Sequence, residues 1–498
     1  MDVATPATRQ YDNHIGGERV PPAEGRRFDS VNPTTGEVWG RFAESGRVDI
    51  DRAVKAARAA FDGPWGKLSP TRKGRLMMAW GERIAENAEA IAAMETQQNG
   101  KLIAEMRAQA KVVRDFLYYF GGLADKIEGR VIPLDRTSVL NYTLREPLGV
   151  VGVIVPWNSP TFLTIMSVCP ALAAGNTLVL KPSEVTSGSA FELARLAEEA
   201  GIPPGVINVV TGGREAGEAL VEHEGIAKIS FTGSEMGGRA IAAKAGSRLA
   251  GVTLELGGKS ANIVFGDADL ARAEAGVLAG IFAAAGQTCV AGSRAFVHES
   301  IYDQLSERLV KRALAIKLGD PLLAETQMGP VATAAQLQKD QQMIDRAVSE
   351  GAEVLAGGKR AKVAGFDKGL FFEPTILHKA GLDNHIMKEE VFGPVLALTR
   401  FRDDEEVLRM ANATRFGLAA GVWTSSLTRA HTMARRLQAG TVWINTYRAL
   451  TFNSPFGGFK ASGLGRANGM ESVEQYLQTK SVWVEMSEEV QDPFVLRT

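Results

Sequence analysis

One cysteine in a glycine-rich, polar stretch is the clearest chemical feature of this sequence. The chain reads Gly286-Gln287-Thr288-Cys289-Val290-Ala291-Gly292, and Leu254-Glu255-Leu256-Gly257-Gly258-Lys259 lies upstream. A cysteine thiolate is a strong nucleophile, and a carboxylate from a separate segment can act as its general base. We therefore predict these roles for Cys289 and Glu255. Each has an ordinary alternative, because lone cysteines are commonly core residues and glutamates after strands are commonly solvated.

Attack of a thiolate on a carbonyl group creates an oxyanion, which needs fixed hydrogen-bond donors. Asn158, in Pro156-Trp157-Asn158-Ser159-Pro160, is the predicted side-chain donor, and the backbone N–H of Cys289 is the second. The alternative for Asn158 is a turn residue between two prolines. The other cysteine, Cys169, lies in an apolar run and is predicted to be a core residue.

Two segments that follow expected strands predict a nucleotide site. Phe231-Thr232-Gly233-Ser234 opens a helix, where small residues let a pyrophosphate approach backbone N–H groups. Lys181-Pro182-Ser183-Glu184 follows another strand, and Glu184 can accept the hydroxyls of an adenosine ribose. A carboxylate there repels a 2′-phosphate, which favours NAD over NADP. The alternatives are a plain turn and a loop ion pair.

Alternating strands and helices are expected to position these residues. The pattern predicts parallel sheets with right-handed crossovers, in which ligands bind at the carboxyl ends of the strands. The expected strands are 150–155, 177–180, 207–210, 227–231, 252–256, 261–265, 293–297, 395–401 and 441–445, and the expected helices include 187–200, 234–245 and 301–315. Ser69-Pro70 is predicted to start an earlier helix with a buried stripe at Leu76, Trp80 and Ile84. Residues 481–485 are an expected edge strand, paired either within the chain or with a partner subunit.

Composition narrows the class of protein. The chain has 498 residues, 45% of them hydrophobic, which predicts two or three domains with large cores. A net charge of -1 gives no reason to bind nucleic acid or an anionic membrane. No apolar run is long enough to cross a membrane, and residues 1–20 do not resemble a secretory signal. The first ten residues are expected to form a loose arm. Two cysteines favour a reducing cytoplasm, and six scattered histidines predict no metal site.

Seven segments, in this order along residues 12–485, resemble the motifs of the aldehyde dehydrogenase superfamily. They are Pro156-Trp157-Asn158, Lys181-Pro182-Ser183-Glu184, Phe231-Thr232-Gly233-Ser234, Glu255-Leu256-Gly257-Gly258-Lys259, Gly286-Gln287-Thr288-Cys289, Glu390-Val391-Phe392-Gly393-Pro394 and Ser454-Pro455-Phe456-Gly457-Gly458. Seven ordered matches make chance similarity negligible.

The resemblance implies an α/β fold with three modules. A Rossmann-like NAD-binding domain would contain residues 1–124 and 147–257, and a second α/β catalytic domain would contain residues 258–477. A small β oligomerisation arm would combine residues 125–146 and 478–498, giving a homodimer or homotetramer. The cofactor-binding residues implied are Ile154, Pro156, Trp157, Lys181, Ser183, Glu184, Gly213, Gly233, Ser234, Leu256, Glu390 and Phe392.

The resemblance also implies a reaction. The Cys289 thiolate would add to an aldehyde, hydride would leave for NAD, and a thioester would form. Water activated by Glu255 would then release the carboxylic acid. Lys181 and Glu184 would hold the adenosine ribose, Ser234 the pyrophosphate, and Glu390 and Phe392 the nicotinamide end.

One motif of this chain departs from the family pattern, and one loop bears on its substrate. Many members have Gly-Arg-Glu where this sequence has Gly465-Arg466-Ala467, which puts any proton relay through that glutamate in doubt. Glu471, about one helical turn further on, is a hypothetical substitute. The segment 445–452 resembles the substrate-entrance loop, in which Arg448 can hold a carboxylate or face solvent.

Leu450 and Phe456 suggest a partly apolar substrate pocket. Three other classes compete with a hydrolytic aldehyde dehydrogenase. A coenzyme A-acylating dehydrogenase would not need the base Glu255. A non-catalytic scaffold would not need the three catalytic residues, and a cysteine hydrolase would leave the nucleotide segments unexplained.

Overall fold

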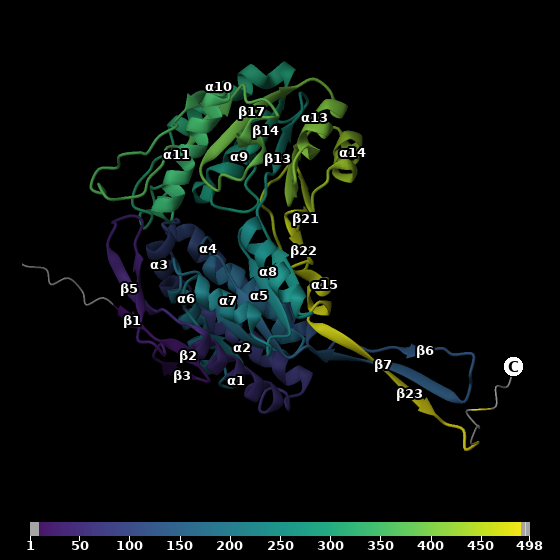
Figure 1. Ribbon diagram of the computed structural model, residues 1–498. Helices are drawn as coiled ribbons and strands as arrows, with labels where there is room; N and C mark the ends of the chain where they lie inside the picture. Colours follow the sequence, from purple (N-terminus) through teal and green to yellow (C-terminus); the bar gives the residue numbers. More distant parts are fainter. Residues whose placement is uncertain (1–8, 490–493, 495–498) are drawn as a thin grey trace, which may run out of the picture.

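Two α/β units are stacked on each other, and a narrow β-arm projects from the first (Figure 1). The structure is a computed structural model, and it describes residues 9–489 and residue 494. The first unit (purple to teal) contains the N-terminal half of the chain, and the second is mostly green. Parallel sheets in a mixed α/β arrangement confirm the predicted fold class.

The first unit is built around an eight-stranded sheet. Its parallel centre contains β8 (Val150–Ile154), β9 (Thr177–Lys181), β10 (Ile207–Val209), β11 (Lys228–Thr232) and β12 (Gly251–Glu255), and its edges contain β2 (Asn13–Ile15), β3 (Glu18–Val20) and β22 (Gly463–Leu464). The spatial order is β22-β12-β11-β8-β9-β10-β2-β3. The chain therefore proceeds outward from β8 to β10 and then returns to β11 on the other side of β8. Such a reversal leaves a crevice at the carboxyl ends of the two strands, where ligands bind.

Helices cover both faces of this sheet. One core contains side chains of α2 (Pro70–Glu86), α3 (Ala88–Asn99), α4 (Ile103–Leu123), α5 (Pro160–Ala173) and α6 (Gly188–Glu199), and the other contains side chains of α1 (Arg47–Asp62), α7 (Arg214–Glu222) and α8 (Glu235–Ser247). The predicted helix start is confirmed, because the Ser69 hydroxyl accepts a hydrogen bond from the Arg72 backbone N–H. Leu76, Trp80 and Ile84 are buried as predicted.

The second unit has a seven-stranded sheet with its own core. Its strands are β13 (Ala261–Val264), β14 (Arg294–His298), β15 (Glu353–Ala356), β16 (Thr375–His378), β17 (Val395–Phe401), β19 (Ala419–Trp423) and β20 (Thr441–Ile444). Their order is β15-β16-β17-β14-β13-β19-β20, and every pair except β15–β16 is parallel. The helices include α9 (Leu270–Ile281), α10 (Tyr302–Leu314), α11 (Ala334–Ser349), α12 (His385–Lys388) and α14 (Leu427–Arg436). All nine expected strands are present within a residue or two of the predicted limits.

The chain returns to the first unit before it ends. β22 pairs with β12, bringing Leu464 opposite Leu254, and α15 (Gly469–Glu474) packs on α5. The range 258–477, expected from the sequence to form the catalytic domain, thus includes a segment that lies on the other sheet. No change of composition marks this return, because the two-residue strand has no periodicity to detect.

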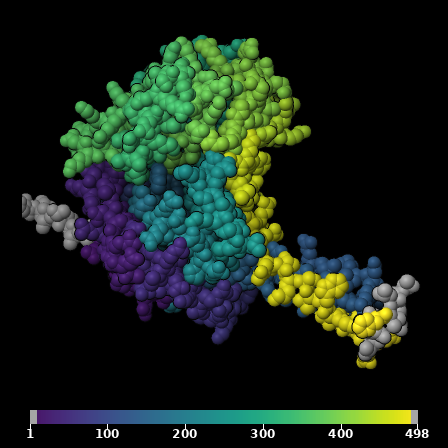
Figure 2. All heavy atoms as spheres, viewed as in Figure 1, coloured from purple at the N-terminus to yellow at the C-terminus, as the bar shows by residue number. Residues whose placement is uncertain are grey.

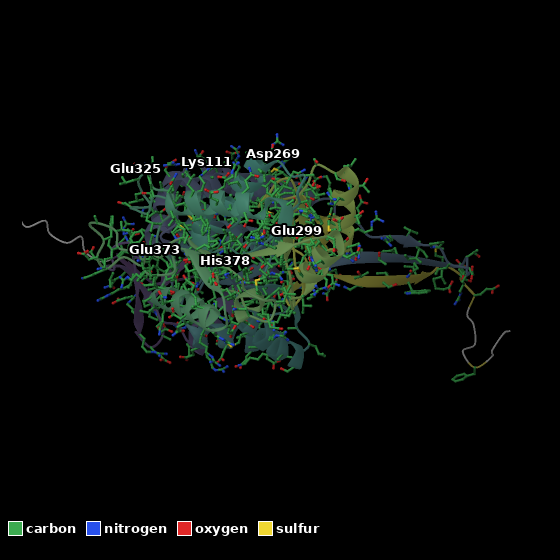
Figure 3. All side chains as sticks on the ribbon, turned by 90° about the horizontal axis from the view of Figure 1, so that it is seen from above. Lys111, Asp269, Glu299, Glu325, Glu373 and His378 are labelled. Carbon is green, nitrogen blue, oxygen red and sulfur yellow. The ribbon has the colours of Figure 1, made fainter. Side chains whose placement is uncertain are left out.

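The arm is a three-stranded antiparallel sheet of β6 (Val131–Ile132), β7 (Val139–Pro147) and β23 (Leu477–Glu485). The expected edge strand therefore pairs within the chain, along β7. The arm extends away from the body in Figures 1, 2 and 3. Apolar side chains on it face solvent, with Val131 72% and Trp483 64% exposed.

The expected loose N-terminal arm falls mainly on residues 1–8, which lie outside the described residues. Residues 9–11 form β1 (Arg9–Tyr11), which pairs with β5 (Val38–Ala43), so the end of the expected arm is ordered. Among the described residues, no helix is long and apolar enough to cross a membrane.

Candidate active site

The three predicted catalytic side chains come from three elements and meet beside the reversal in the first sheet. Glu255 is the last residue of β12, Asn158 follows β8, and Cys289 follows a 3-10 turn at Ala283–Gly286. The Asn158 Nδ2 donates to the backbone oxygen of Gln287 at 3.0 Å. A Cβ on Gly258 would lie 2.6 Å from the carbonyl oxygen of Cys289, so only glycine lets the two segments approach this closely.

Cys289 is a partly buried free thiol. Burial, together with the negative charges of Glu255 and Glu390, raises its pKa to about 12, and the backbone N–H groups of Val290 and Cys289 lower it in part. The thiol therefore keeps its proton in this arrangement. Forming the thiolate requires a nearby proton acceptor or a change in the surrounding charge.

Glu255 is the least satisfied charged group of the site. It is 5% exposed, and neither carboxyl oxygen has a hydrogen-bond partner among the described residues. Burial raises its pKa well above the usual range, which the positive charge of Arg466 and the Ala467 backbone N–H only partly offset. A raised pKa makes the carboxylate a stronger base, which suits a general base.

The residues expected to bind a nucleotide lie at the carboxyl ends of the same strands. Ser234 caps α8 and accepts a hydrogen bond from the Gly237 N–H, and a Cβ on Gly233 would lie 2.4 Å from the Phe231 ring. The first turn of α8 thus offers backbone N–H groups beside a glycine whose replacement would push on the Phe231 ring. This arrangement fits a pyrophosphate.

Lys181 ends β9, and its buried Nζ lies 3.2 Å from the Pro182 oxygen and 3.9 Å from Glu184. Burial lowers the pKa of Lys181. Glu184, which is exposed, and Glu44 line a cavity of about 480 Å³ together with Gly213, whose N–H donates to Glu44. The two carboxylates around this cavity, with the Lys181 ammonium group 3.9 Å from Glu184, fit the hydroxyls of a ribose.

Other predicted nucleotide contacts hold the backbone in place. Ile154 pairs with Lys181 and Phe231 at the ends of their strands, and the Ser183 hydroxyl accepts from the Val185 N–H. The Leu256 N–H donates to the Ser462 oxygen, which fastens the end of β12 to the returning chain. Pro156 lies between β8 and Asn158.

Glu390 and Phe392 lie on the other side of the crevice, in the second unit. The Glu390 Oε1 accepts from the Gly258 N–H at 2.9 Å, and the ring of Phe392 lies edge-on to Trp157 with centroids 5.4 Å apart. The segment 390–393 therefore connects the two units directly beside Cys289. Phe392 has a φ of 65°, which residues other than glycine rarely adopt.

The predicted substrate residues differ in their surroundings. Phe456 is buried and exchanges both backbone hydrogen bonds with Ala467, whereas Leu450 is 40% exposed. Arg448 is not a free surface cation, because its Nη2 lies 3.3 Å from the Glu105 carboxylate. The Arg448 side chain is 23% exposed, and its charge is already partly neutralised by Glu105.

Comparison with known proteins identifies the family. The family model described as Aldehyde dehydrogenase family matches residues 20–482. The chain is 44% identical to the (Z)-2-((N-methylformamido)methylene)-5-hydroxybutyrolactone dehydrogenase of Acinetobacter baylyi, over 98% of this chain and 100% of that protein. The chain belongs to the aldehyde dehydrogenase family.

Solved structures of the same family have the same fold. An NAD+ complex of an aldehyde dehydrogenase from Bacillus cereus is 42% identical, with a TM-score of 0.94 over 96% of this chain and 97% of that one. A betaine aldehyde dehydrogenase from Staphylococcus aureus in complex with NAD+ is 37% identical, with a TM-score of 0.95 over 97% of this chain and 96% of that one. As a member of the aldehyde dehydrogenase family, the chain is an oxidoreductase that acts on aldehydes.

At position 467, where many aldehyde dehydrogenases have a glutamate, this chain has a small buried alanine. Ala467 lies against Glu255, and Glu471 is exposed on α15. Gln475 instead holds this strand, since its amide bonds the backbone of Arg466 in both directions and the Thr253 hydroxyl. Nothing in the described contacts supports Glu471 as a substitute.

Several residues that build this aldehyde dehydrogenase site carry no signal in the sequence. Lys101 is buried and donates to the Ser159 hydroxyl at 3.1 Å, next to Asn158. The Asn99 amide donates to the Trp157 oxygen at 3.3 Å. Gln287 is buried and accepts from the Ala332 N–H. Lys101 and Asn99 are distant in sequence from the residues that they hold and fit none of the motifs, and the Gln287 motif does not reveal its contact with Ala332, so only the fold shows these contacts.

Proposed function

We propose that this chain oxidises an aldehyde to a carboxylic acid with NAD, using Cys289 as nucleophile, Asn158 as oxyanion donor and Glu255 as general base. The observation that carries the proposal is the buried Glu255 carboxyl group, which has no hydrogen-bond partner and shifts the pKa of Cys289. A buried carboxyl group without partners destabilises the fold, so its place beside a thiol supports a catalytic use.

NAD fits the crevice by the chemistry of the residues that face it. The N-terminal turn of α8 with Gly233 and Ser234 would hold the pyrophosphate, and Lys181 with Glu184 would hold the adenosine ribose. Glu390 and Phe392 would hold the nicotinamide end. When bound, NAD accepts a hydride from the carbon of the substrate that is oxidised. Glu184 favours NAD because its carboxylate would repel the 2′-phosphate of NADP.

The chain's own residues would act in two stages. In the first, the Cys289 thiol gives its proton to the Glu255 carboxylate, which passes it on to solvent, and the sulfur bonds to the aldehyde carbon while the Asn158 amide and the Cys289 N–H stabilise the oxyanion. Loss of hydride from that carbon leaves a thioester on Cys289. In the second stage Glu255 takes a proton from water, the hydroxide displaces the thiolate, and the carboxylic acid leaves.

Two alternatives remain less well supported. A coenzyme A-acylating enzyme would not need a water-activating carboxyl group, yet Glu255 is held in the site. A non-catalytic scaffold would have no need for Cys289, Glu255 and Asn158 in one place. Arg448 would bind a substrate carboxylate only by leaving Glu105, so we propose a partly apolar pocket formed by Leu450 and Phe456 as the main contact of the aldehyde.

The arm supports a proposal about assembly. Exposed apolar side chains on β6, β7 and β23 would be covered in a homodimer or homotetramer. A reducing cytoplasm is proposed as the location, since the thiols of Cys169 and Cys289 are both free. Light scattering of the wild type and of Trp483→Lys would test the assembly, with a smaller particle expected for the variant.

The reaction is tested by the absorbance of reduced nicotinamide when purified protein is mixed with NAD and a panel of aldehydes. We expect absorbance with the wild type and with Cys169→Ala, and background with Cys289→Ala. The two variants are a matched pair, because Cys169 is a fully buried thiol whose pKa burial raises far above its usual value. Absorbance that appears only after coenzyme A is added would replace this proposal with the acylating class.

A further inference from the structure

A buried clamp on α11 holds the segment that carries Glu390 and Phe392. The Gln336 Nε2 donates to the backbone oxygen of Val391 at 2.9 Å and to the Asp340 Oδ1 at 2.7 Å. Both clamp residues are buried. Because one amide nitrogen serves both acceptors, the Asp340 carboxyl group fixes the direction in which Gln336 holds the segment.

Gly393 lies directly against this carboxyl group. A Cβ on Gly393 would be 2.2 Å from the Asp340 Oδ1, and a Cβ on Gly286 would be 2.0 Å from the Gly393 carbonyl oxygen. Gly393 is thus packed between α11 and the segment that leads to Cys289. The neighbouring Phe392 has left-handed backbone angles, which persist in a non-glycine residue only when its surroundings impose them.

Asp340 is poorly suited to carry a charge in this place. Its exposed fraction is 0%, and its Oδ2 has no hydrogen-bond partner among the described residues. Burial raises its pKa to about 7, although the hydrogen bond from Gln336 and the charge of Lys339 lower it. The neutral and charged forms therefore both occur near neutral pH.

Charged groups on the neighbouring elements are few. Lys339 precedes Asp340 on α11, and Glu390 lies on the clamped segment. Lys259 lies beyond Glu390, and burial lowers its pKa to about 7 as well. His385 lies on α12, which packs on α11, and bonds Glu350. Of these groups only Lys339 shifts the pKa of Asp340.

We infer that Asp340 is a proton-dependent positioning residue for the cofactor site. In its neutral form it packs against Gly393 and, through Gln336, holds the segment 390–393 in place. An ionised Asp340 would need water or a donor at Oδ2, and admitting one would displace the segment 390–393, whose Gly393 packs against the carboxyl group. The inference rests on the proposed function, because it assigns Glu390 and Phe392 to the NAD site.

The test is the dissociation constant of NAD, measured by calorimetry between about pH 6 and about pH 8. If NAD binding raises the pKa of Asp340 by about one unit, the wild-type dissociation constant rises about fivefold from about pH 6 to about pH 8. Asp340→Asn, which is neutral and of the same shape, should bind NAD tightly at both pH values. Steady-state kinetics should show the same change in KM for NAD, with little change in kcat.

The chain offers a matched control on the same helix. The Gln341 Nε2 donates to the Asp345 Oδ1 at 2.9 Å, which repeats the clamp geometry four residues apart on the exposed side. Asp345→Asn should therefore retain the wild-type pH dependence. Gln336→Met should weaken NAD binding at both pH values, which tests the clamp even where Asp340→Asn folds poorly.

Three outcomes separate this inference from the proposed function. A wild type that binds no NAD at any pH would refute the proposed function, and the inference with it. A wild-type constant that does not change with pH would overturn the inference alone. A pH dependence that survives in Asp340→Asn would also overturn it, and would assign the titration to another group such as Lys259.

Discussion

Polar side chains at the carboxyl ends of the two sheets differ in how fully they are hydrogen-bonded within the protein. In the first sheet, Glu255 ends β12 with both carboxyl oxygens unpaired, and Lys181 ends β9 with one carbonyl oxygen as its hydrogen-bond partner. These groups lie at the carboxyl ends of β12 and β9, on either side of the neighbouring strands β11 and β8 at which the strand order reverses. Their remaining hydrogen-bonding capacity is not used by other groups of the protein and is available to a ligand.

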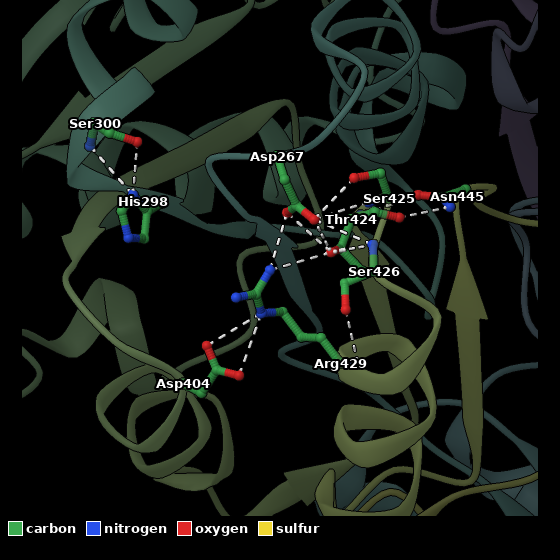
Figure 4. A network of polar contacts seen from close by, with 9 residues as sticks. All are labelled: Asp267, His298, Ser300, Asp404, Thr424, Ser425, Ser426, Arg429 and Asn445. Atoms are coloured by element: carbon green, nitrogen blue, oxygen red, sulfur yellow. Dashed lines mark hydrogen bonds and ion pairs between the residues drawn. The ribbon is translucent and has the colours of Figure 1, made fainter.

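In the second sheet the corresponding carboxylate is saturated. Asp267 follows β13 and accepts hydrogen bonds from the Thr424 hydroxyl at 2.8 Å, from Ser425 and Ser426, and from Arg429 at 3.1 Å (Figure 4). Arg429 also pairs with Asp404 at 3.2 Å. The pKa of Asp267 lies below its usual value, because the Thr424 and Ser425 hydroxyls and the charge of Arg429 outweigh its burial.

This difference distinguishes a functional site from a hydrogen-bond network that only stabilises the fold. An unpaired buried polar group lowers stability and persists where chemistry requires it, whereas a saturated group stabilises the fold. Substitutions at the end of the first sheet should therefore change activity more than stability. Substitutions at the end of the second sheet should do the reverse.

The largest expected effect is at Glu255. Glu255→Gln should lower kcat by about 10²–10⁴-fold, since the amide cannot take a proton from water. The free energy of unfolding should not fall, because a neutral side chain replaces a buried, unpaired carboxyl group. The wild-type rate should rise with pH as Glu255, whose pKa is raised, ionises, and this rise should disappear in the variant. A pH–rate profile with the same alkaline rise in both proteins would contradict the assignment.

Asn158 should give the next largest effect. Asn158→Ala removes one of two oxyanion donors, so kcat should fall by about 10²–10³-fold. Stopped-flow measurement of the first turnover should show that formation of the thioester, rather than its hydrolysis, slows most. Asn176→Ala, in which a buried asparagine with similar backbone bonds is removed from a structural position, is the control. It should lower stability and leave kcat of the folded enzyme nearly unchanged.

At the second sheet we expect the opposite result. Asp267→Ala should lower the free energy of unfolding by about 2 kcal/mol, because several donors lose a charged acceptor. Urea denaturation would measure this change, and kcat should stay within about twofold of wild type. Asp404→Asn should have a smaller effect, since Arg429 keeps its contact with Asp267. A kcat for Asp267→Ala as low as that of Asn158→Ala would remove the distinction between the two sheets.

The smallest expected effect is a change in the preference for NAD over NADP. Glu184→Gln removes the carboxylate that would repel a 2′-phosphate, so the ratio of kcat/KM for NADP over NAD should rise by about tenfold. The half-buried Glu192, on α6, serves as the control position for loss of one negative charge. An unchanged ratio in Glu184→Gln would mean that another group, such as Glu44, determines the preference.

Local sequence was sufficient to predict most of the strands and helices. The strands at 150–154 and 177–181 are apolar runs that only a sheet buried on both faces accommodates, and Ser69-Pro70 marked a helix start by chemistry that acts within one turn. Glu255, Ser234 and Lys181 could be placed because each lies at the carboxyl end of such a strand or just after it. The return of residues 463–464 to the first sheet could not be predicted, because nothing local distinguishes a two-residue strand from a turn.

The sequence by itself determined the class of chemistry, since a thiol, a carboxyl group and a strand–glycine–helix turn are fixed by residue type and local spacing. Tertiary structure decided which groups remain unpaired. The pKa of Glu255, the pairing of Arg448 with Glu105 and the clamp of Asp340 on Gly393 all depend on burial and on partners far away in the chain. Solvation and Coulomb interactions are set by distance in space, and spacing along the sequence does not contain that distance.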